Sequence, residues 1–212
     1  MFEQVLQKGA KDALAILGKS KLLDDAYMAG GTGLALQLGH RVSVDFDFFT
    51  TKTFEARPLV EQLNKPPLNF ELERIEWGTI IGRFSKTKFS LFFYDYPLID
   101  RPIRFLDSNI ASIKDIAAMK LLAISERGIK RDFIDLYFIL AEEKLLTLKE
   151  VFELYEKKFK MLRQNDAHLL KSLTYFEDAD KTTVPEMLKP ANWKEIKRFF
   201  EKEVKYLAKQ EF

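Results

Sequence analysis

The chain lacks cysteine and has little histidine and little net charge. With no cysteine among its 212 residues, it can form neither disulfides nor thiolate metal sites. Its two histidines leave little room for a zinc site built from imidazole ligands. The net charge of +2, from 34 basic and 32 acidic side chains, argues against a protein that binds nucleic acid through bulk charge, although a local basic patch is compatible with it.

Long hydrophobic runs are also missing. None approaches the roughly 20 residues that a membrane-spanning helix needs. The first residues, MFEQVLQKGAKDALAILGKS, are amphipathic and interrupted by charges, which is unlike a signal peptide. We therefore expect a cytoplasmic protein with no membrane association. Hydrophobic residues make up 47% of the chain, and 19 of them are phenylalanine, so a large aromatic core fits this length.

The pattern of elements changes near residue 107. Before it, helices and strands alternate, and three β-rich stretches within 69–96 indicate an antiparallel meander. After Pro102 we expect no further strands. We expect domains at 1–106 and 107–212, the first α/β and the second helical. The other expected elements are helices at 2–18 (ending at Gly18), 32–39, 53–63, 113–127, 130–143, after Thr147, within 163–190 and after Asn192, and strands at 26–31 and 43–50.

Two aspartates interrupt the apolar stretch SVDFDFFT, residues 43–50. Alternate side chains of a strand share a face, so Asp45 and Asp47 project together while Phe46 and Phe48 point the other way. Two carboxylates this close repel each other, and a divalent cation would compensate both. Mg²⁺ is commonly held by one or two carboxylates together with substrate phosphates. The pair therefore predicts a metal site.

Two glycines stand shortly before this pair. Gly30 and Gly31 end a strand and lead into a helix that begins near Thr32. Glycine lets the backbone approach a ligand closely, a helix N-terminus favours phosphate, and the Thr32 hydroxyl adds a donor. An isolated Asp-x-Asp is often a pair of surface carboxylates, and an isolated Gly-Gly is often a turn. Their joint occurrence favours a site for a nucleoside triphosphate bound as its magnesium complex.

Other phosphate and metal motifs do not fit the chain. It contains no G-x-x-x-x-G-K-[ST] loop, and its glycines do not match G-x-G-x-x-G. The aspartate pair also lacks the twelve-residue calcium-loop pattern.

Two separated stretches resemble one known family. GGTGLALQLGHRVSVDFDFF, residues 30–49, resembles the first motif of AbiEii/AbiGii-type nucleotidyltransferases, a branch of the DNA polymerase β-like superfamily. SIKDIAAMKLLAISERGIKRDFIDLYFIL, residues 112–140, resembles the helical motif of the same family, with Lys120 followed by Asp132 and Asp135. The two motifs stand in the family's order, and the resemblance covers about residues 25–140.

The resemblance implies an α+β protein with the nucleotidyltransferase fold, a small mixed β-sheet flanked by helices, followed by a C-terminal helical domain. It implies transfer of a nucleotidyl group from an NTP, with Mg²⁺ or Mn²⁺ on Asp45 and Asp47, by in-line displacement. It also implies roles for further residues: Lys120 and Asp132 in catalysis, and Gly30, Gly31, Thr32, Arg41 and Arg127 in binding the nucleotide, with Lys120 and Arg127 as candidates for neutralising triphosphate charge.

Asp132 and Asp135 lie three residues apart, on one face of a helix. They are either part of the site or structural residues that cap the helix or pair with Arg127, Lys130 or Arg131.

The superfamily usually places a third carboxylate on a neighbouring strand. The corresponding stretch, KFSLFFYDY, has Ser90, Leu91 and Phe92 at its middle and an acid, Asp95, only near its end. Other acids stand in FELERIEW, where the spacing fits a strand edge that faces water: Glu71, Glu73 and Glu76.

The leading hypothesis is therefore a nucleotidyltransferase, the toxin of a bacterial toxin–antitoxin or phage-defence system, with an antitoxin protein as a partner. The acceptor stays open among transfer-RNA ends, other RNA, a protein hydroxyl and a small molecule. The missing mid-strand acid supports an alternative, a catalytically inactive nucleotide-binding or partner-binding module with the same fold. A sugar-nucleotide transferase that uses Asp-x-Asp for manganese is a third hypothesis, but it would need a longer nucleotide-binding domain.

Overall fold

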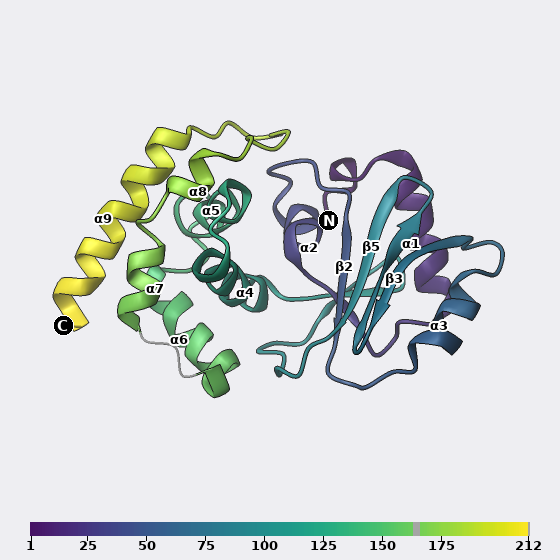
Figure 1. Ribbon diagram of the computed structural model, residues 1–212. Coiled ribbons are helices and arrows are strands. Elements are labelled where there is room, and N and C mark those ends of the chain that lie inside the picture. The colour runs from purple at the N-terminus through teal and green to yellow at the C-terminus, as the bar shows by residue number, and fades with distance from the viewer. Residues whose placement is uncertain (163–165, 212) are drawn as a thin grey trace. The chain divides into compact units, whose positions relative to one another are not determined.

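The computed structural model describes residues 1–162 and 166–211 (Figure 1). The chain divides into two compact units, Met1–Ser112 and Ile113–Phe212. We expected a boundary after residue 106. The division falls later because a hairpin at 103–110 belongs to the sheet of the first unit.

The first unit contains a mixed sheet with the strand order β3-β4-β5-β2-β1-β7-β6. The predicted meander is confirmed, since β3 pairs with β4 and β4 pairs with β5, both antiparallel. β2 lies parallel to β5 and antiparallel to β1. This mixed sheet with flanking helices is the predicted fold class. The strands are β1 (Tyr27–Met28), β2 (Phe46–Thr50), β3 (Phe70–Glu76), β4 (Thr79–Phe84), β5 (Thr87–Phe93), β6 (Ile103–Phe105) and β7 (Ser108–Ile110).

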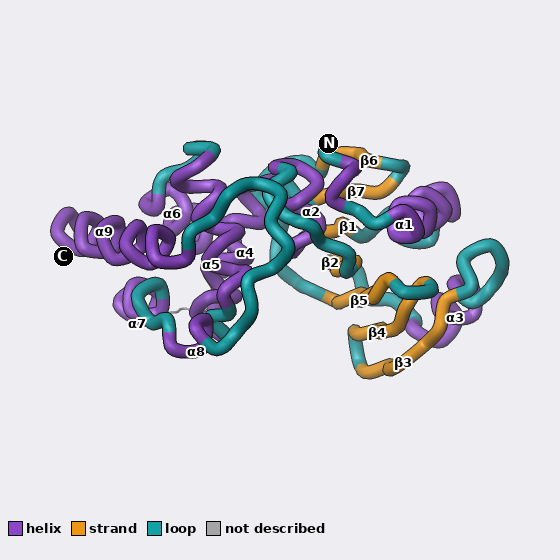
Figure 2. Tube along the Cα trace, turned by 90° about the horizontal axis from the view of Figure 1, so that it is seen from above, coloured by secondary structure: helices purple, strands orange, loops and turns teal. Residues whose placement is uncertain are grey.

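Three α-helices and a short 3₁₀ turn accompany the sheet: η1 (Glu3–Val5), α1 (Lys8–Ser20), α2 (Gly30–Leu38) and α3 (Ala56–Leu63). Figure 2 shows α1 and α3 on the same side of the row of strands. Their apolar side chains form one core with the buried face of the sheet, at about 1.5–3 kcal/mol for each large apolar side chain removed from water. This core includes Leu14, Leu17, Val60, Leu63, Phe46, Phe48, Ile80, Phe89 and Leu91.

The prediction that strands end after Pro102 is wrong. β6 and β7 pair antiparallel, and β7 then pairs with β1 in parallel, with Met28 opposite Ile110. Each of the two strands is three residues long. So short a segment shows no alternation that a sequence pattern could reveal.

The expected helix stop at Gly18 is also wrong. α1 continues to Ser20, and Lys21 forms its left-handed cap with φ 59°. A Cβ on Gly18 would lie 2.0 Å from the carbonyl oxygen of Leu106. Glycine is therefore needed here for close approach of the helix to the β6–β7 turn.

The second unit is helical, as predicted. α4 packs against α5, α6 and α7, and α5 packs against α8 and α9. The helix expected after Thr147 is confirmed as α6, which begins with a capping box formed by Thr147 and Glu150. The helices are α4 (Ile113–Glu126), α5 (Lys130–Tyr137), η2 (Phe138–Glu142, a π-helical turn), α6 (Leu148–Phe159), η3 (Lys160–Leu162), α7 (Asp166–Ser172), α8 (Glu177–Asp180) and α9 (Trp193–Glu211).

Part of the helix expected within 163–190 lies outside the described residues, which resume at Asp166. Within 1–162 and 166–211, no helix combines the length and the hydrophobicity that crossing a membrane would need.

Candidate functional site

The aspartate pair lies at the start of β2, which continues as Phe46–Thr50. Phe46 and Phe48 are buried in the core, whereas Asp47 and Phe49 are half-buried on the opposite face. The predicted alternation therefore holds from Phe46 onward. Asp45 lies just before the regular strand and is half-buried as well.

Gly30 holds the first turn of α2 against the carboxylate of Asp47. Its φ of +62° is a left-handed conformation that glycine adopts without cost. A Cβ at this position would lie 3.1 Å from Oδ2 of Asp47. The N-cap of α2 is Ala29, which has no side chain that could cap the helix. The start of α2, where backbone N–H groups favour an anion, therefore lies beside a candidate metal ligand.

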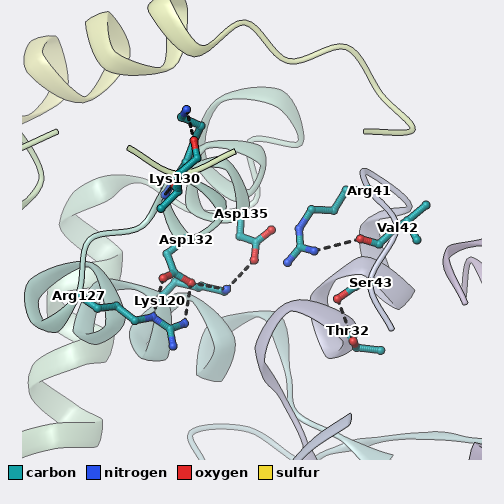
Figure 3. A network of polar contacts seen from close by, with 10 residues as sticks. Thr32, Arg41, Val42, Ser43, Lys120, Arg127, Lys130, Asp132 and Asp135 are labelled. Atoms are coloured by element: carbon teal, nitrogen blue, oxygen red, sulfur yellow. Dashed lines mark hydrogen bonds and ion pairs between the residues drawn. The ribbon is translucent and has the colours of Figure 1, made fainter. Parts of the chain in front are cut away.

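Gly31 makes room for a cation. A Cβ on Gly31 would lie 2.2 Å from Nη2 of Arg41 and 3.2 Å from Oγ of Ser43. The Arg41 side chain is buried, and its Nη1 donates a hydrogen bond of 3.1 Å to the carbonyl oxygen of Val42 (Figure 3). The second glycine thus lies against a guanidinium group, the side chain best suited to bind phosphate in a bidentate manner.

Thr32 connects the glycine turn to the aspartate segment. Its buried hydroxyl lies 2.5 Å from the backbone carbonyl oxygen of Asp45, to which it donates, and 2.9 Å from the Ser43 hydroxyl (Figure 3). These bonds fix the segment that leads into β2. Binding of phosphate by Thr32 stays a prediction.

The strand beside β2 carries no acid opposite Asp47. β5 pairs with β2 in parallel, and its Ser90 stands directly opposite Asp47. Asp95 lies two positions beyond the end of β5 and is exposed. Glu71, Glu73 and Glu76 lie on β3, which β4 and β5 separate from β2. The third carboxylate usual in the superfamily therefore has no counterpart on β5.

The donor set of this face suits Mg²⁺. Among residues 1–162 and 166–211, no three histidine, aspartate or glutamate side chains gather as a complete metal site. Mg²⁺ does not require one, because it usually takes one or two carboxylates and completes its octahedral shell with water and substrate oxygens. Asp47 supplies a carboxylate beside a turn suited to phosphate, and Asp45 stands two residues before it, so these donor types fit the ion.

The second unit contains a buried acid–base cluster formed by Lys120, Arg127, Asp132 and Asp135 (Figure 3). Nζ of Lys120, on α4, lies 2.9 Å from Oδ1 of Asp132 and 2.5 Å from Oδ2 of Asp135. Arg127 adds bonds from Nε (2.9 Å) and Nη2 (3.1 Å) to the two oxygens of Asp132. The side chains of Lys120 and both aspartates are at most 5% exposed, while that of Arg127 is 52% exposed.

The charges of this cluster set the pKa of Asp132. Burial alone would raise that pKa, but Lys120 and Arg127 outweigh burial through their charge and hydrogen bonds, so the pKa lies below its usual value. Asp132 is therefore held as a carboxylate. Its ionised form orients both cations.

The structure decides part of the alternative left open for the two aspartates. Asp132 pairs with Arg127, as the structural alternative expected, and also with Lys120. Of the other two partners offered, Lys130 points elsewhere: its Nζ donates to the carbonyl oxygen of Thr182, at 2.5 Å, and lies 5.4 Å from the centre of the Trp193 ring. Whether the cluster also serves the reaction stays a prediction.

Two contacts of the candidate site were not predicted from the sequence. Ser43 was not chosen as a site residue, although it stands in the same stretch as the aspartates and contacts Thr32. The pairing of Lys120 with Asp135 joins residues fifteen positions apart on two helices. Only the packing of α4 against α5 brings them together.

Comparison with known proteins gives this geometry a context. The family described as "Nucleotidyl transferase AbiEii toxin, Type IV TA system" matches residues 12–76 and 67–209. An uncharacterized protein of Aquifex aeolicus (strain VF5) is 39% identical over 209 residues, which span 94% of this chain and 96% of that protein.

Three solved structures are similar in fold. A candidate nucleotidyltransferase of Helicobacter pylori has a TM-score of 0.53 and 17% identity, over 96% of both chains. JHP933 of H. pylori has a TM-score of 0.51 and 18% identity, over 97% of this chain and 96% of that one. MenT4, a nucleotidyltransferase toxin of Mycobacterium tuberculosis H37Rv, has a TM-score of 0.51 and 17% identity, over 94% of this chain and 86% of that one. At these identities the likeness shows the fold.

Proposed function

Because the chain belongs to the AbiEii nucleotidyltransferase toxin family, we propose that it transfers a nucleotidyl group from an NTP to an acceptor hydroxyl. RNA, including transfer RNA, is the acceptor class we favour over protein. The observation that carries the proposal is the close approach of Gly30 to the carboxylate of Asp47, which puts an anion-binding helix start beside a candidate metal ligand. We further propose that the protein acts in the cytoplasm, as a toxin or phage-defence factor, with a cognate antitoxin protein as its partner.

In this proposal the residues of the first unit bind and orient the nucleotide. Asp45 and Asp47 would hold Mg²⁺, with Mn²⁺ as an alternative, together with phosphate oxygens of the NTP. When bound, such an ion stabilises negative charge on the reacting phosphate. The turn at Gly30, Gly31 and Thr32 would hold the phosphates, and the Arg41 guanidinium would offset their charge.

The reaction is an in-line displacement at the α-phosphorus. A bond forms between the acceptor oxygen and the α-phosphorus, the bond to the oxygen bridging the α- and β-phosphates breaks, and pyrophosphate leaves with that oxygen. The hydroxyl proton passes to solvent, since Ser90 stands where a carboxylate could have accepted it. Lys120 and Arg127 would neutralise charge on the triphosphate, and Asp132 would position both.

The experiment is incubation with each α-labelled NTP, Mg²⁺ and either total RNA or total protein. We expect label on RNase-sensitive material, and loss of transfer in Asp47→Asn. The matched control is Asp107→Asn, an exposed aspartate of the same unit in a left-handed turn that asparagine tolerates. Absence of transfer with every NTP, together with absence of NTP binding by calorimetry, would contradict the proposal.

The second candidate function is a catalytically inactive module that binds a nucleotide or a partner. Ser90 opposite Asp47, in place of an acid, is the observation that favours it. NTP binding without turnover, with the same affinity in wild type and Asp47→Asn, would support this function over the first. RNase-resistant, protease-sensitive label would keep the enzyme but replace RNA by protein as its acceptor.

A further inference from the structure

A cavity of about 310 Å³ opens within the helical unit. The C-terminal end of α4 with the following turn forms one wall, and α7 and the segment after it form the other. Pockets that bind small ligands begin at about this size. Of its lining residues, only Arg127 has a place in the proposed reaction.

Basic side chains line this cavity from both walls. Arg127, His168 and Lys171 line it, together with the acids Glu126 and Asp178. Asp178 is already neutralised by Lys181, at 2.8 Å. His168 and Lys171 stand three residues apart on α7 and therefore project from the same side of that helix. Two cationic groups, Arg127 on one wall and Lys171 on the other, are thus available to a phosphate.

An aromatic ring adds a second kind of contact. Tyr175 lines the cavity and is 45% exposed. Its hydroxyl donates to Oε2 of Glu177 at 3.0 Å, which ties down one end of the ring. An exposed, anchored ring beside lysine and arginine is the combination on which single-stranded nucleic acids bind, with bases stacked on the ring and phosphates on the cations.

The cavity is also joined to the acid–base cluster. Arg127 contributes to both, because its Nε and Nη2 bind Asp132 while the same half-exposed side chain lines the cavity. A phosphate bound in the cavity would therefore lie against a group that the proposed reaction uses. Arg127 is the one lining residue that also belongs to the acid–base cluster.

We propose that this cavity binds a phosphorylated nucleoside, a nucleotide unit of the RNA acceptor, with the base on Tyr175 and the phosphate near Arg127 and Lys171. The inference rests on the proposed function, since it assigns part of the acceptor to a place on the chain. The same chemistry is present in a free nucleotide, and the test separates the two sources.

The test measures binding of a fluorescent single-stranded RNA of twelve nucleotides by anisotropy, with full-length protein and without turnover. We expect Lys171→Ala and Tyr175→Ala each to weaken RNA binding by about tenfold. Lys171→Ala should also lower the slope of log affinity against log salt by about 0.7, the value for one lost single-strand phosphate contact. Tyr175→Phe keeps the ring and should bind like wild type.

The control is Lys205→Ala, which removes an exposed lysine of α9 that does not line the cavity. Unchanged RNA affinity and salt slope in Lys171→Ala and Tyr175→Ala would overturn the proposal. Loss of AMP or NTP binding by calorimetry in these variants, with RNA binding intact, would also overturn it and assign the cavity to a free nucleotide. Because Lys171 and Tyr175 are exposed, unchanged thermal unfolding checks that the variants fold.

The two proposals can fail separately. If no nucleotidyl group is transferred but RNA binding depends on Lys171 and Tyr175, the proposed reaction is wrong, and the assignment of the cavity to RNA stands. If transfer proceeds and RNA affinity is unchanged by substitution of either residue, the cavity assignment is wrong and the proposed reaction stands.

Discussion

Gly31 is the single residue whose replacement tests the nucleotide end of the site most directly. A Cβ here would meet Nη2 of Arg41 at 2.2 Å, and Arg41 is only 4% exposed, so its guanidinium has little room to move. We expect Gly31→Ala to weaken NTP binding by tenfold or more, about 1.4 kcal/mol. Isothermal titration calorimetry with Mg²⁺ and each NTP measures this.

The matched control is Gly9→Ala. A Cβ on Gly9, in α1, would meet no atom within 4 Å. Alanine there should leave NTP affinity unchanged and raise the free energy of unfolding by up to about 1 kcal/mol. Wild-type NTP affinity in Gly31→Ala would show that the position of the Arg41 guanidinium does not matter for the nucleotide.

Asp132 offers a prediction about pH. The pKa of its carboxyl is lowered from the ordinary 3.8, so folding favours its charged form. The corresponding stability is present above the unfolded-state pKa and is lost as pH falls through the folded-state pKa. We expect Asp132→Asn to cost about 3 kcal/mol at pH 7, because it leaves Lys120 and Arg127 incompletely paired. Below about pH 4 the difference from wild type should shrink.

Urea unfolding between pH 7 and pH 3 measures this difference, with the exposed Asp107→Asn as the control that should follow wild type throughout. A gap between Asp132→Asn and wild type that stays constant down to pH 3 would show that the carboxylate is not held by these cations.

Between elements, a second buried ion pair joins α4 to α6. Nζ of Lys158 lies 2.8 Å from Oδ1 of Asp115, and both side chains are fully buried. Burial lowers the pKa of Lys158, and the bond and charge of Asp115 oppose that effect only in part. Removing one partner of such a pair is costly, whereas replacing both by apolar groups is often neutral.

We therefore expect Lys158→Met to lose about 3–5 kcal/mol of unfolding free energy. The double variant Asp115→Leu/Lys158→Met should recover most of that loss, because no buried charge remains. The free energies of unfolding in urea of wild type, Asp115→Leu, Lys158→Met and the double variant form the double-mutant cycle. If the double variant is as unstable as Lys158→Met, the pair contributes more than charge compensation.

Elements with a strong local pattern could be predicted from the sequence, and elements made by distant pairing could not. Phe46 and Phe48 alternate with Asp47 within one strand, and β4 and β5 of the meander show the same period. β7 is different, because it is three residues long and is a strand only through its pairing with β6 and β1. Gly18 was misread for a similar reason, since the atom that requires glycine there belongs to Leu106.

In the candidate site, too, the features close together in the sequence could be predicted, and those made by distant segments could not. The glycines and aspartates lie within about twenty residues, so their joint occurrence was readable. That Ser90 stands opposite Asp47 depends on the parallel pairing of β2 with β5. That Lys120 lies between Asp132 and Asp135 depends on helix packing in the second unit. Such contacts are set by tertiary structure, which the pattern of a single sequence does not display.

For the whole molecule, the small number of carboxylates at the site predicts that metal and nucleotide stabilise the protein only together. Asp45 and Asp47 leave most of the octahedral shell of Mg²⁺ to water and to substrate oxygens. We therefore expect Mg²⁺ alone and EDTA to leave the unfolding temperature unchanged. Mg²⁺ with NTP at a hundred times its Kd should add about 2.7 kcal/mol, roughly 5–10 °C for a chain of this size.

Because the chain consists of two compact units, calorimetry can also show which of them the nucleotide contacts. A ligand raises the unfolding temperature only of a unit that it binds. The roles proposed for Asp47 and for Lys120 place one residue in each unit, so both transitions should rise, and neither should rise in Asp47→Asn. If only the transition of residues 1–112 rises, Lys120 and Arg127 do not bind the triphosphate, and their buried cluster stabilises the helical unit alone.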